Sequence, residues 1–441
     1  MSLPVLTLGT AAVDFVSGLE RLHGPVTVVR RCTELADLLA AAQSGLARAA
    51  IVAGQTQDLD GGVLERLHSA EVSVVALTDD GGERLRLEAL GIRTGAETVE
   101  PEALAALVAE SAAQLQSAWP PARAAAGAAG PRLAGLADPA GALRPRAADP
   151  VQPGLPAAKG ELVAVWGPAG APGRTTVAVN LAAECAAGGQ RTLLVDADTY
   201  GASVAAFLGL LDESAALAHA CRMADQGMLD REAFERVCLK VAVTGTSLRV
   251  LTGITRVDRW TELRPSALGT VLELARALAD VVVVDCGFSL EHEEELSFDS
   301  MAPRRNGATL RVLELADRVL AVGSADSVGL PRLVRALDEL AHAVPSASAE
   351  VVLNKVRAAA VGARPEAQLR EAWERFGPVR EIRALLPADP AAADAALLGG
   401  SVLLESAPDS ALRHAIAGLA GSRLAAPRRG LRRRTLVKVK F

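Results

Sequence analysis

Short apolar runs of strand length alternate with helical patterns over two parts of the chain, residues 1–117 and 160–422. In the larger part the apolar runs are continuous, which is typical of parallel strands covered by helices on both faces. The pattern predicts an α/β protein with a small N-terminal unit followed by a larger, doubly wound, mostly parallel sheet. The strands predicted in the larger unit are Leu162–Trp166, Thr192–Val195, Leu248–Leu251, Val281–Val284, Val319–Val322, Val351–Leu353 and Ile382–Leu386. The predicted helices between most of them include Val177–Ala187, Ala267–Ala277, Ala308–Ala316, Leu330–Ala341 and Glu366–Phe376.

The smaller unit has its own alternation of elements. Its predicted strands are Val5–Leu8, Ala50–Ala53 and Val72–Leu77, and its predicted helices are Thr33–Ala42, Gly62–His68 and Pro101–Gln116. This order is similar to that of a response-regulator receiver domain, which carries acids after its first strand and an Asp ending its third. Here Gly9 and small residues follow the first strand, Ala53 and Gly54 end the third, and Asp58 and Asp60 read as turn residues. We therefore expect a receiver-like scaffold without phosphotransfer, used for contacts.

Two segments lack periodic apolar spacing. Residues 118–159 are rich in Ala, Pro and Gly, which is the composition of a flexible linker. Residues 423–441 form a basic tail in which Arg and Lys are interleaved with apolar residues. A solvated tail and a contact for acidic lipid or an acidic partner both fit this composition, and the stretch TLVKVKF also alternates like an edge-pairing strand.

Composition narrows the classes of function. A chain of 441 residues suggests two to three domains, and a net charge of −6 argues against a nucleic-acid surface along the whole chain. The five cysteines are scattered without a CxxC pair, which fits a reducing compartment. With no signal peptide pattern and no long uncharged apolar run, a cytoplasmic protein is expected, with peripheral association at the membrane or cell pole as a further expectation.

The stretch from Glu161 to Asn180 has the order strand, glycine-rich loop, basic residue, hydroxyl and helix. This is the order of a phosphate-binding loop, in which small residues let backbone amides turn toward phosphate oxygens and the helix adds its dipole. The usual pattern is G-x-x-x-x-G-K-[ST]; here Pro168 replaces the first Gly and Arg174 replaces the Lys. An ordinary glycine-rich turn is the alternative. The predicted contacts are Gly170, Ala171, Pro172, Gly173, Arg174, Thr175 and Thr176, with the Thr175 hydroxyl available to Mg²⁺.

Polar residues also follow three other predicted strands. Asp196 and Asp198 come at the end of one strand, where two acids can hold Mg²⁺ through water or orient an attacking water. Asp285 follows four apolar residues, the Walker B arrangement, and Asn354 follows another strand, where its amide can pair with a purine edge. Capping or turn roles are the alternative for each residue. Together they predict one site, because ligands of doubly wound sheets lie at the carboxyl ends of the strands.

The segments GAPGRTTVAVNLA and LLVDADTYGAS resemble the phosphate loop and the acidic strand of the ParA/MinD superfamily of deviant Walker A ATPases. Within it, the chain looks most like the CpaE/TadZ branch, which joins a receiver-like domain to such an ATPase. The resemblance implies ATP and Mg²⁺ as ligands and a catalytic, phosphate-binding role for Arg174. Implied for the remaining residues are water orientation and switching by Asp196 and Asp198, metal binding by Thr175, Asp198 and Asp285, adenine contact by Asn354, and a base-bordering loop at Pro387.

One departure concerns a lysine near the start of the family's loop, which reaches the partner subunit's nucleotide across a dimer. This chain has Ala169 at that position. Because negative charge developing on the phosphates must be neutralised, the loss of a cation predicts weak or slow hydrolysis. Arg304 and Arg305, which follow the strand ending at Asp285, are candidates for the missing charge. A solvated pair of loop arginines is the alternative.

The resemblance implies a switch ATPase that localises or assembles a Flp/Tad pilus or a related type II/IV secretion machine. Its expected partners are a second copy in a homodimer, the pilus secretion ATPase, and a polar or membrane landmark protein. Two alternatives stay open. A chromosome- or plasmid-partitioning ATPase would bind DNA, which the acidic total and the tail-confined basic cluster disfavour. A scaffold that binds nucleotide without turnover, or binds none, fits the substitutions at positions 169 and 174.

Overall fold

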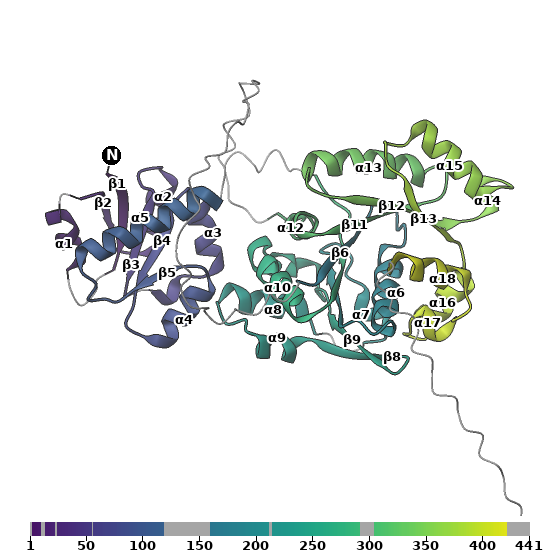
Figure 1. Cartoon of the computed structure of the whole chain (residues 1–441), viewed down its shortest axis with the longest axis horizontal. Helices are drawn as coiled ribbons and strands as arrows, with labels where there is room; N and C mark the ends of the chain where they lie inside the picture. Colours follow the sequence, from purple (N-terminus) through teal and green to yellow (C-terminus); the bar gives the residue numbers. More distant parts are fainter. Residues whose placement is uncertain are drawn as a thin grey trace, which may run out of the picture. The chain divides into compact units, whose positions relative to one another are not determined.

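The computed structural model describes residues 2–9, 14–22, 24–54, 56–118, 159–210, 214–291 and 304–420. The chain divides into two compact units, residues 1–158 and 159–441 (Figure 1). Residues 119–158 of the predicted linker and the whole predicted basic tail lie outside the described residues. Among the helices of the described ranges, none is long and apolar enough to cross a membrane.

A five-stranded parallel sheet in the order β2-β1-β3-β4-β5 forms the first unit. This 2-1-3-4-5 order is that of flavodoxin-like doubly wound sheets. Side chains alternate between the faces, so Leu6 and Val52 contact one helix layer and Val5 and Ile51 the other. The elements are β1 (Leu3–Leu8), α1 (Phe15–Leu22), β2 (Val26–Cys32), α2 (Leu35–Gln43), β3 (Ala49–Ala53), α3 (Gly61–Ser69), β4 (Ser73–Leu77), α4 (Gly81–Ala89), β5 (Arg93–Gly95) and α5 (Pro101–Ala118).

Every strand and helix predicted for this unit is present, but the sequence pattern did not predict β2, β5, α1 or α4. The reason for β2 is that it is an edge strand with exposed residues in its middle, so it lacks a continuous apolar run. At the end of β1, a Cβ on Gly9 would lie 1.8 Å from the carbonyl oxygen of Ala53. Asp60 accepts the Val63 N–H at 2.7 Å and caps α3.

An eight-stranded sheet in the order β13-β12-β11-β6-β10-β7-β9-β8 forms the second unit. Neighbouring strands are parallel except β8 and β9, which form an antiparallel pair at one edge. The seven predicted strands are present, and β8 was missed because its exposed positions break the apolar run. The strands are β6 (Glu161–Trp166), β7 (Thr192–Ala197), β8 (Leu239–Val243), β9 (Thr246–Leu251), β10 (Val281–Cys286), β11 (Arg318–Ser324), β12 (Ala349–Val356) and β13 (Ile382–Pro387).

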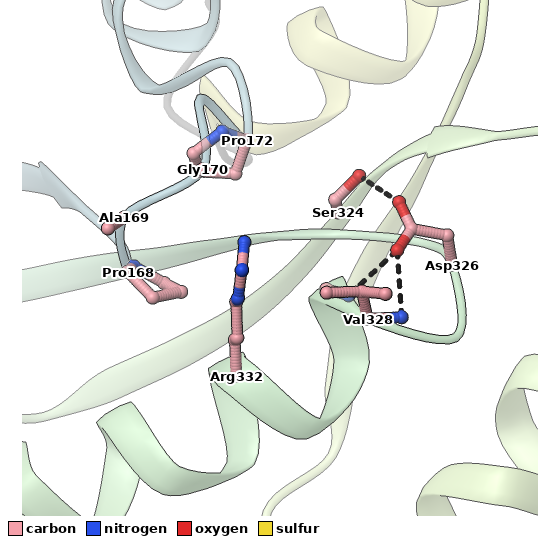
Figure 2. A pocket seen from close by; sticks show the side chains of 9 residues that line it. Pro168, Ala169, Gly170, Pro172, Ser324, Asp326, Val328 and Arg332 are labelled. Carbon is pink, nitrogen blue, oxygen red and sulfur yellow. Dashed lines mark hydrogen bonds between the residues drawn. The ribbon is translucent and has the colours of Figure 1, made fainter.

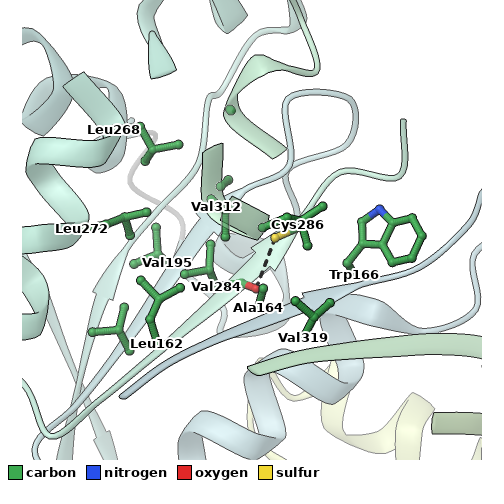
Figure 3. Packing of buried hydrophobic residues seen from close by; sticks show 14 of the residues in the cluster. Leu162, Ala164, Trp166, Val195, Leu268, Leu272, Val284, Cys286, Val312 and Val319 are labelled. Atoms are coloured by element: carbon green, nitrogen blue, oxygen red, sulfur yellow. Dashed lines mark hydrogen bonds between the residues drawn. The ribbon is translucent and has the colours of Figure 1, made fainter. Parts of the chain in front are cut away.

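Helices cover both faces of this sheet (Figure 1). On one face Leu162 of β6 and Val284 of β10 pack with Leu268 and Leu272 of a covering helix (Figure 3). On the other face Val163 of β6 packs in a separate core with the helix that follows it. The first face carries α8 (Ala216–Asp225), α10 (Pro265–Leu278), α12 (Gly307–Leu315), α13 (Gly329–Ala343) and α15 (Pro365–Phe376); the second carries α6 (Arg174–Ala187), α16 (Pro390–Leu398), α17 (Leu403–Ser406) and α18 (Ala411–Ala417). Shorter helices are α7 (Val204–Phe207), α9 (Arg231–Val237) and α14 (Ala358–Val361).

Strand β6 lies between β10 and β11, where the chain changes the direction in which it adds strands. The strands β7 to β10 lie on one side of β6, and β11 to β13 lie on the other. Ligands of doubly wound sheets bind at such a switch point, beyond the carboxyl ends of the strands. The ends of β6, β7, β10 and β12 carry the residues predicted for the site, so the fold brings these residues to one edge of the sheet.

Candidate functional site

The loop between β6 and α6 has left-handed backbone at three positions. The φ angle is 107° at Gly170, 51° at Ala171 and 97° at Gly173, and α6 begins at Arg174. A backbone of this kind turns successive N–H groups toward a common centre and forms a concavity that binds anions. The first turn of α6 adds unpaired amides and the positive end of the helix dipole. The loop therefore has the local geometry of a phosphate cradle.

Arg174 lies back against this loop, with its side chain 13% exposed. Its Nη1 donates to the carbonyls of Gly167 and Pro168, both at 3.1 Å, and its Nη2 donates to Oδ2 of Asp198 at 3.3 Å. Its Nε is buried without a hydrogen-bond partner in the described part of the chain. Because a buried donor without an acceptor costs free energy, an anion in the loop would supply the acceptor that Nε lacks.

Thr175 and Asp285 join the first turn of α6 to the end of β10. Thr175 Oγ1 donates to Asp285 Oδ2 at 2.6 Å. Asp285 is fully buried, and its Oδ1 has no hydrogen-bond partner among the described residues. Burial, together with the charge of Asp196, raises the pKa of Asp285 well above its usual value. A cation beside Oδ1 would satisfy this oxygen and favour the charged carboxylate.

Asp196, at the end of β7, anchors the chain that leads into α7. Its Oδ2 accepts the amides of Ser203 at 2.9 Å and Val204 at 3.0 Å, and its Oδ1 accepts the amide of Asp198 at 3.2 Å. Burial raises the pKa of Asp196 to about 7 in spite of these hydrogen bonds. Because both oxygens are already bonded to backbone, the contacts describe a positioning residue. Orientation of an attacking water by Asp196 stays a prediction.

Asp198 connects the phosphate loop to the segment after β7. One oxygen accepts Arg174, and the other accepts the amides of Tyr200 at 2.8 Å and Gly201 at 3.0 Å. A change in the position of Arg174 would therefore act through Asp198 on residues 199–201. This geometry fits the switch role that the resemblance implies for Asp198. Its role as a metal ligand stays a prediction, because Arg174 engages it in this structure.

Arg305 holds the same segment from another side. Its Nε and Nη2 donate to the carbonyl of Thr199 at 3.1 and 2.9 Å, and its guanidinium lies 4.2 Å from the centre of the Tyr200 ring. The Tyr200 ring in turn lies 4.8 Å from that of Phe288. Arg304 is exposed. Arg305 is thus bonded to the segment after β7 in this structure, and a charge-replacing role for either arginine stays a prediction.

Two residues at the end of β12 hold the loop from the opposite side. Asn354 Nδ2 donates to the carbonyl of Pro172 at 2.8 Å, and Lys355 Nζ donates to the carbonyl of Ala171 at 2.8 Å. A Cβ on Gly173 would lie 2.4 Å from Asn354 Nδ2, so this approach requires glycine. Lys355 and Ala171 both have left-handed φ angles, 62° and 51°. Such strain costs on the order of 1–3 kcal/mol and concentrates at ligand sites.

The side-chain amide of Asn354 is hydrogen-bonded at both ends in this structure. Its Oδ1 accepts the Lys355 N–H at 2.8 Å on its own strand, and its Nδ2 contacts the loop. Adenine contact by Asn354 stays a prediction. Pro387 pairs with Val356 at the end of β13, on the neighbouring strand, and its place beside a base also stays a prediction. The Thr176 carbonyl accepts Asn180 Nδ2 at 2.8 Å within α6.

A cavity of about 210 Å³ borders the loop on the side of β11 and α13 (Figure 2). Pro168, Ala169, Gly170 and Pro172 of the loop line it together with Ser324, Asp326, Val328, Gly329 and Arg332. The Asp326 carboxylate caps α13, because Oδ1 accepts the amides of Val328 at 3.0 Å and Gly329 at 2.7 Å. The Arg332 side chain rises from α13 toward the loop.

The arrangement suits a phosphate chain with a divalent cation. The loop supplies amides and Arg174, while Thr175 and Asp285 present the hard oxygen ligands that Mg²⁺ prefers. Mg²⁺ bound with phosphates usually needs only one or two protein ligands, so this pair would be sufficient. A group of three or more His, Cys, Asp or Glu that could hold a metal by itself is absent from the described ranges.

A phosphate loop at the switch point of a doubly wound sheet defines the class of P-loop nucleotide-binding folds. The sequence profile of the CobQ/CobB/MinD/ParA nucleotide binding domain matches residues 163–402, more than half of the 441 residues. The chain therefore belongs to the CobQ/CobB/MinD/ParA family. No curated protein matches the sequence.

Similar solved structures include two MinD proteins and one ParA protein. The cell division ATPase MinD of Pyrococcus furiosus is 20% identical over 59% of this chain and 97% of its own, with a TM-score of 0.45. A ParA family ATPase from Chlorobium tepidum TLS is 20% identical over 60% and 99%, with a TM-score of 0.48. The septum site-determining protein MinD of Pyrococcus horikoshii OT3, complexed with Mg-ADP, is 19% identical over 59% and 94%, with a TM-score of 0.46.

Sequence reasoning missed two cations beside the loop, Lys355 and Arg332. Lys355 directly follows Asn354, and this adjacency to a strand end was the available signal. Its amine reaches Ala171 only because its own backbone is left-handed, which a sequence pattern does not reveal. Arg332 occupies an exposed position of an amphipathic helix, which reads as ordinary surface.

Proposed function

We propose that this protein binds ATP with Mg²⁺ at the loop after β6 and acts as a nucleotide-controlled switch with weak or slow hydrolysis. The observation that carries the proposal is a single hydrogen-bonded network. Arg174 joins the loop to Asp198, and Thr175 joins the first turn of α6 to Asp285. Phosphate and Mg²⁺ would compete for the same four side chains, so binding must rearrange the contacts between the loop and two neighbouring strands.

The switch follows from what Asp198 holds. When Arg174 turns toward phosphate, Asp198 loses its cationic partner while it still binds the amides of Tyr200 and Gly201. The segment 199–201 also contacts Arg305. A rearrangement of this segment would therefore also move Arg305, which lies in the chain after β10. A surface that differs between the two states can bind a second copy or another partner with different affinity, and this difference is what a nucleotide switch requires.

Two features support slow hydrolysis. Asp196 has both carboxylate oxygens on backbone amides, so it has little freedom to orient an attacking water. Position 169 carries Ala, so the loop itself presents Arg174 as its basic side chain. In phosphoryl transfer the protein contributes mainly positioning and charge neutralisation, and both contributions are reduced here.

Saturating ATP with Mg²⁺ is expected to stabilise the full-length chain against thermal unfolding. Ligand at 100 times its Kd adds about 2.7 kcal/mol to the unfolding free energy, which raises Tm by several degrees. Differential scanning calorimetry with ATP, with ATP and EDTA, and with adenosine separates the contributions of phosphate, metal and base. Identical melting curves under all three conditions would contradict the proposal. Phosphate release is measured in parallel, and binding without release would favour a non-hydrolysing scaffold.

We further propose a cellular role of the CpaE/TadZ type, in which the ATP state recruits a Flp/Tad pilus or secretion ATPase. The combination of a five-stranded parallel unit with the nucleotide-binding unit supports this assignment. Purified pilus secretion ATPase should be captured by the immobilised protein with a non-hydrolysable ATP analogue and not with ADP. Equal capture, or none, in the two nucleotide states would reject the cellular role and leave the nucleotide switch standing.

A further inference from the structure

Arg332, in the first turn of α13, brings a guanidinium to the phosphate loop on the side of the cavity (Figure 2). A Cβ placed on Gly170 would lie 2.7 Å from Arg332 Nη1, so this nitrogen is nearly in contact with the loop backbone. The loop and α13 come from opposite sides of the switch point, and the strand before α13, β11, pairs directly with β6. The pairing of β11 with β6 therefore places the backbone of α13 beside the loop.

The carboxylate that lines the cavity together with Arg332 is already bonded elsewhere. Asp326 accepts Ser324 Oγ at 2.7 Å on Oδ2 and two backbone amides on Oδ1. The guanidinium of Arg332 has no hydrogen bond or ion pair within the described ranges, and only its backbone N–H donates, to the carbonyl of Val328 at 3.3 Å. For comparison, Arg335 on the same helix donates to the carbonyl of Pro331 at 3.4 Å. Among the described residues, the exposed guanidinium of Arg332 therefore has no acceptor, although it lies beside a loop whose backbone favours anions.

The residues around the loop differ in whether they bring a positive charge to its cavity side. Arg174 is bonded to carbonyls at the start of the loop and to Asp198. Ala169, on the cavity side, contributes no charge. Arg332 lies on that side, next to Gly170. A planar guanidinium can donate two parallel hydrogen bonds to phosphate oxygens, which makes it a strong partner for a terminal phosphate.

We propose that Arg332 binds the terminal phosphate of the nucleotide held by its own chain's loop and supplies the positive charge that residue 169 does not provide. The inference rests on the proposed function, because it needs a triphosphate in the loop. Arg332 would be the residue by which the site distinguishes ATP from ADP. Arg174 would serve both nucleotides, whereas Arg332 would contact only the phosphate that ADP lacks.

The test compares Arg332→Ala with wild type by isothermal titration calorimetry, using a non-hydrolysable ATP analogue and ADP, both with Mg²⁺. We expect the analogue to bind about tenfold more weakly, equivalent to ~1.4 kcal/mol, while ADP binds as in wild type. Arg335→Ala, which removes a neighbouring arginine of the same helix, should leave both affinities unchanged. The double variant Ala169→Lys with Arg332→Ala should recover affinity for the analogue, because it restores a cation on the same cavity wall.

Three results would overturn the inference. The first is wild-type affinity for the analogue in Arg332→Ala. The second is an equal loss for ADP and the analogue, which would mean that Arg332 supports the loop and not the terminal phosphate. The third is a loss that appears only at protein concentrations where two copies associate, which would assign the contact to a partner chain. If wild type itself binds neither nucleotide, the proposed function fails, and that result is separate from these three.

Discussion

Replacing Arg174 by alanine is expected to weaken binding of ATP with Mg²⁺ at least about 100-fold, equivalent to ~2.8 kcal/mol. Arg174 is the basic side chain of the loop, and its Nε is a buried donor with no acceptor in the described ranges. A hydrogen bond to a charged group contributes about 1.5–3 kcal/mol, and a guanidinium can make two of them. Calorimetric titration of the purified full-length chain measures the loss directly.

Arg174→Lys is the matched control. It keeps the charge but not the fork, so we expect affinity within about tenfold of wild type. Thermal unfolding without nucleotide shows whether Arg174→Ala is still folded, because Asp198 then lacks its cationic partner. Wild-type nucleotide affinity in a folded Arg174→Ala protein would place the phosphates elsewhere and reject the site.

Replacing Asp285 by asparagine is expected to have opposite effects on stability and on metal-dependent binding. Without nucleotide at pH 8, the variant should be more stable by about 1–2 kcal/mol, because it removes a buried charge that has an unpaired oxygen. The Mg²⁺-dependent part of nucleotide affinity should be lost, because the asparagine has no anionic oxygen for the ion. Melting curves with and without Mg-ADP measure both effects.

The raised pKa of Asp285 also determines whether the free energy of unfolding rises or falls with pH. The pKa of Asp285 is raised by burial, so above the unfolded pKa the native state binds more protons and stability falls as pH rises. Asp196 contributes in the same direction, with a fall that ends near its pKa of about 7. Wild type without nucleotide should therefore lose stability from about pH 4 upward, and Asp285→Asn should lose less.

Asp280→Asn is the matched control, because that carboxylate lies outside the site. Hydrogen bonds from Arg191 lower the pKa of Asp280. Its contribution to stability is present above the unfolded pKa and is lost as pH falls, which is the opposite sign. This variant should be slightly less stable than wild type at pH 8 and should bind Mg-ADP normally. If the stability of Asp285→Asn changed with pH as that of wild type does, the raised pKa assigned to the buried Asp285 carboxyl group would be contradicted.

The secondary structure was predictable where its signal is local. The buried strands β6, β7, β10 and β11 read as unbroken apolar runs because helices cover them on both faces. The strands missed were edge or very short strands, and exposed residues interrupt the apolar run in β2 and β8. The site residues at the strand ends followed from the same reading, because parallel strands place their carboxyl ends at one edge of the sheet.

The sequence by itself determined the α/β class, the glycine-rich loop after β6 and the kinds of side chain expected around it. Spacing along the chain carries this information, since periodicity and loop composition are local properties. The tertiary structure alone decided how those side chains are used. Asn354 and Lys355 donate hydrogen bonds to a loop more than 180 residues away in the sequence. Arg332 lies beside that loop but belongs to another helix, and Asp196 accepts hydrogen bonds from backbone amides. Such contacts depend on strand order and on the close packing of the sheet's two sides, which no local pattern specifies.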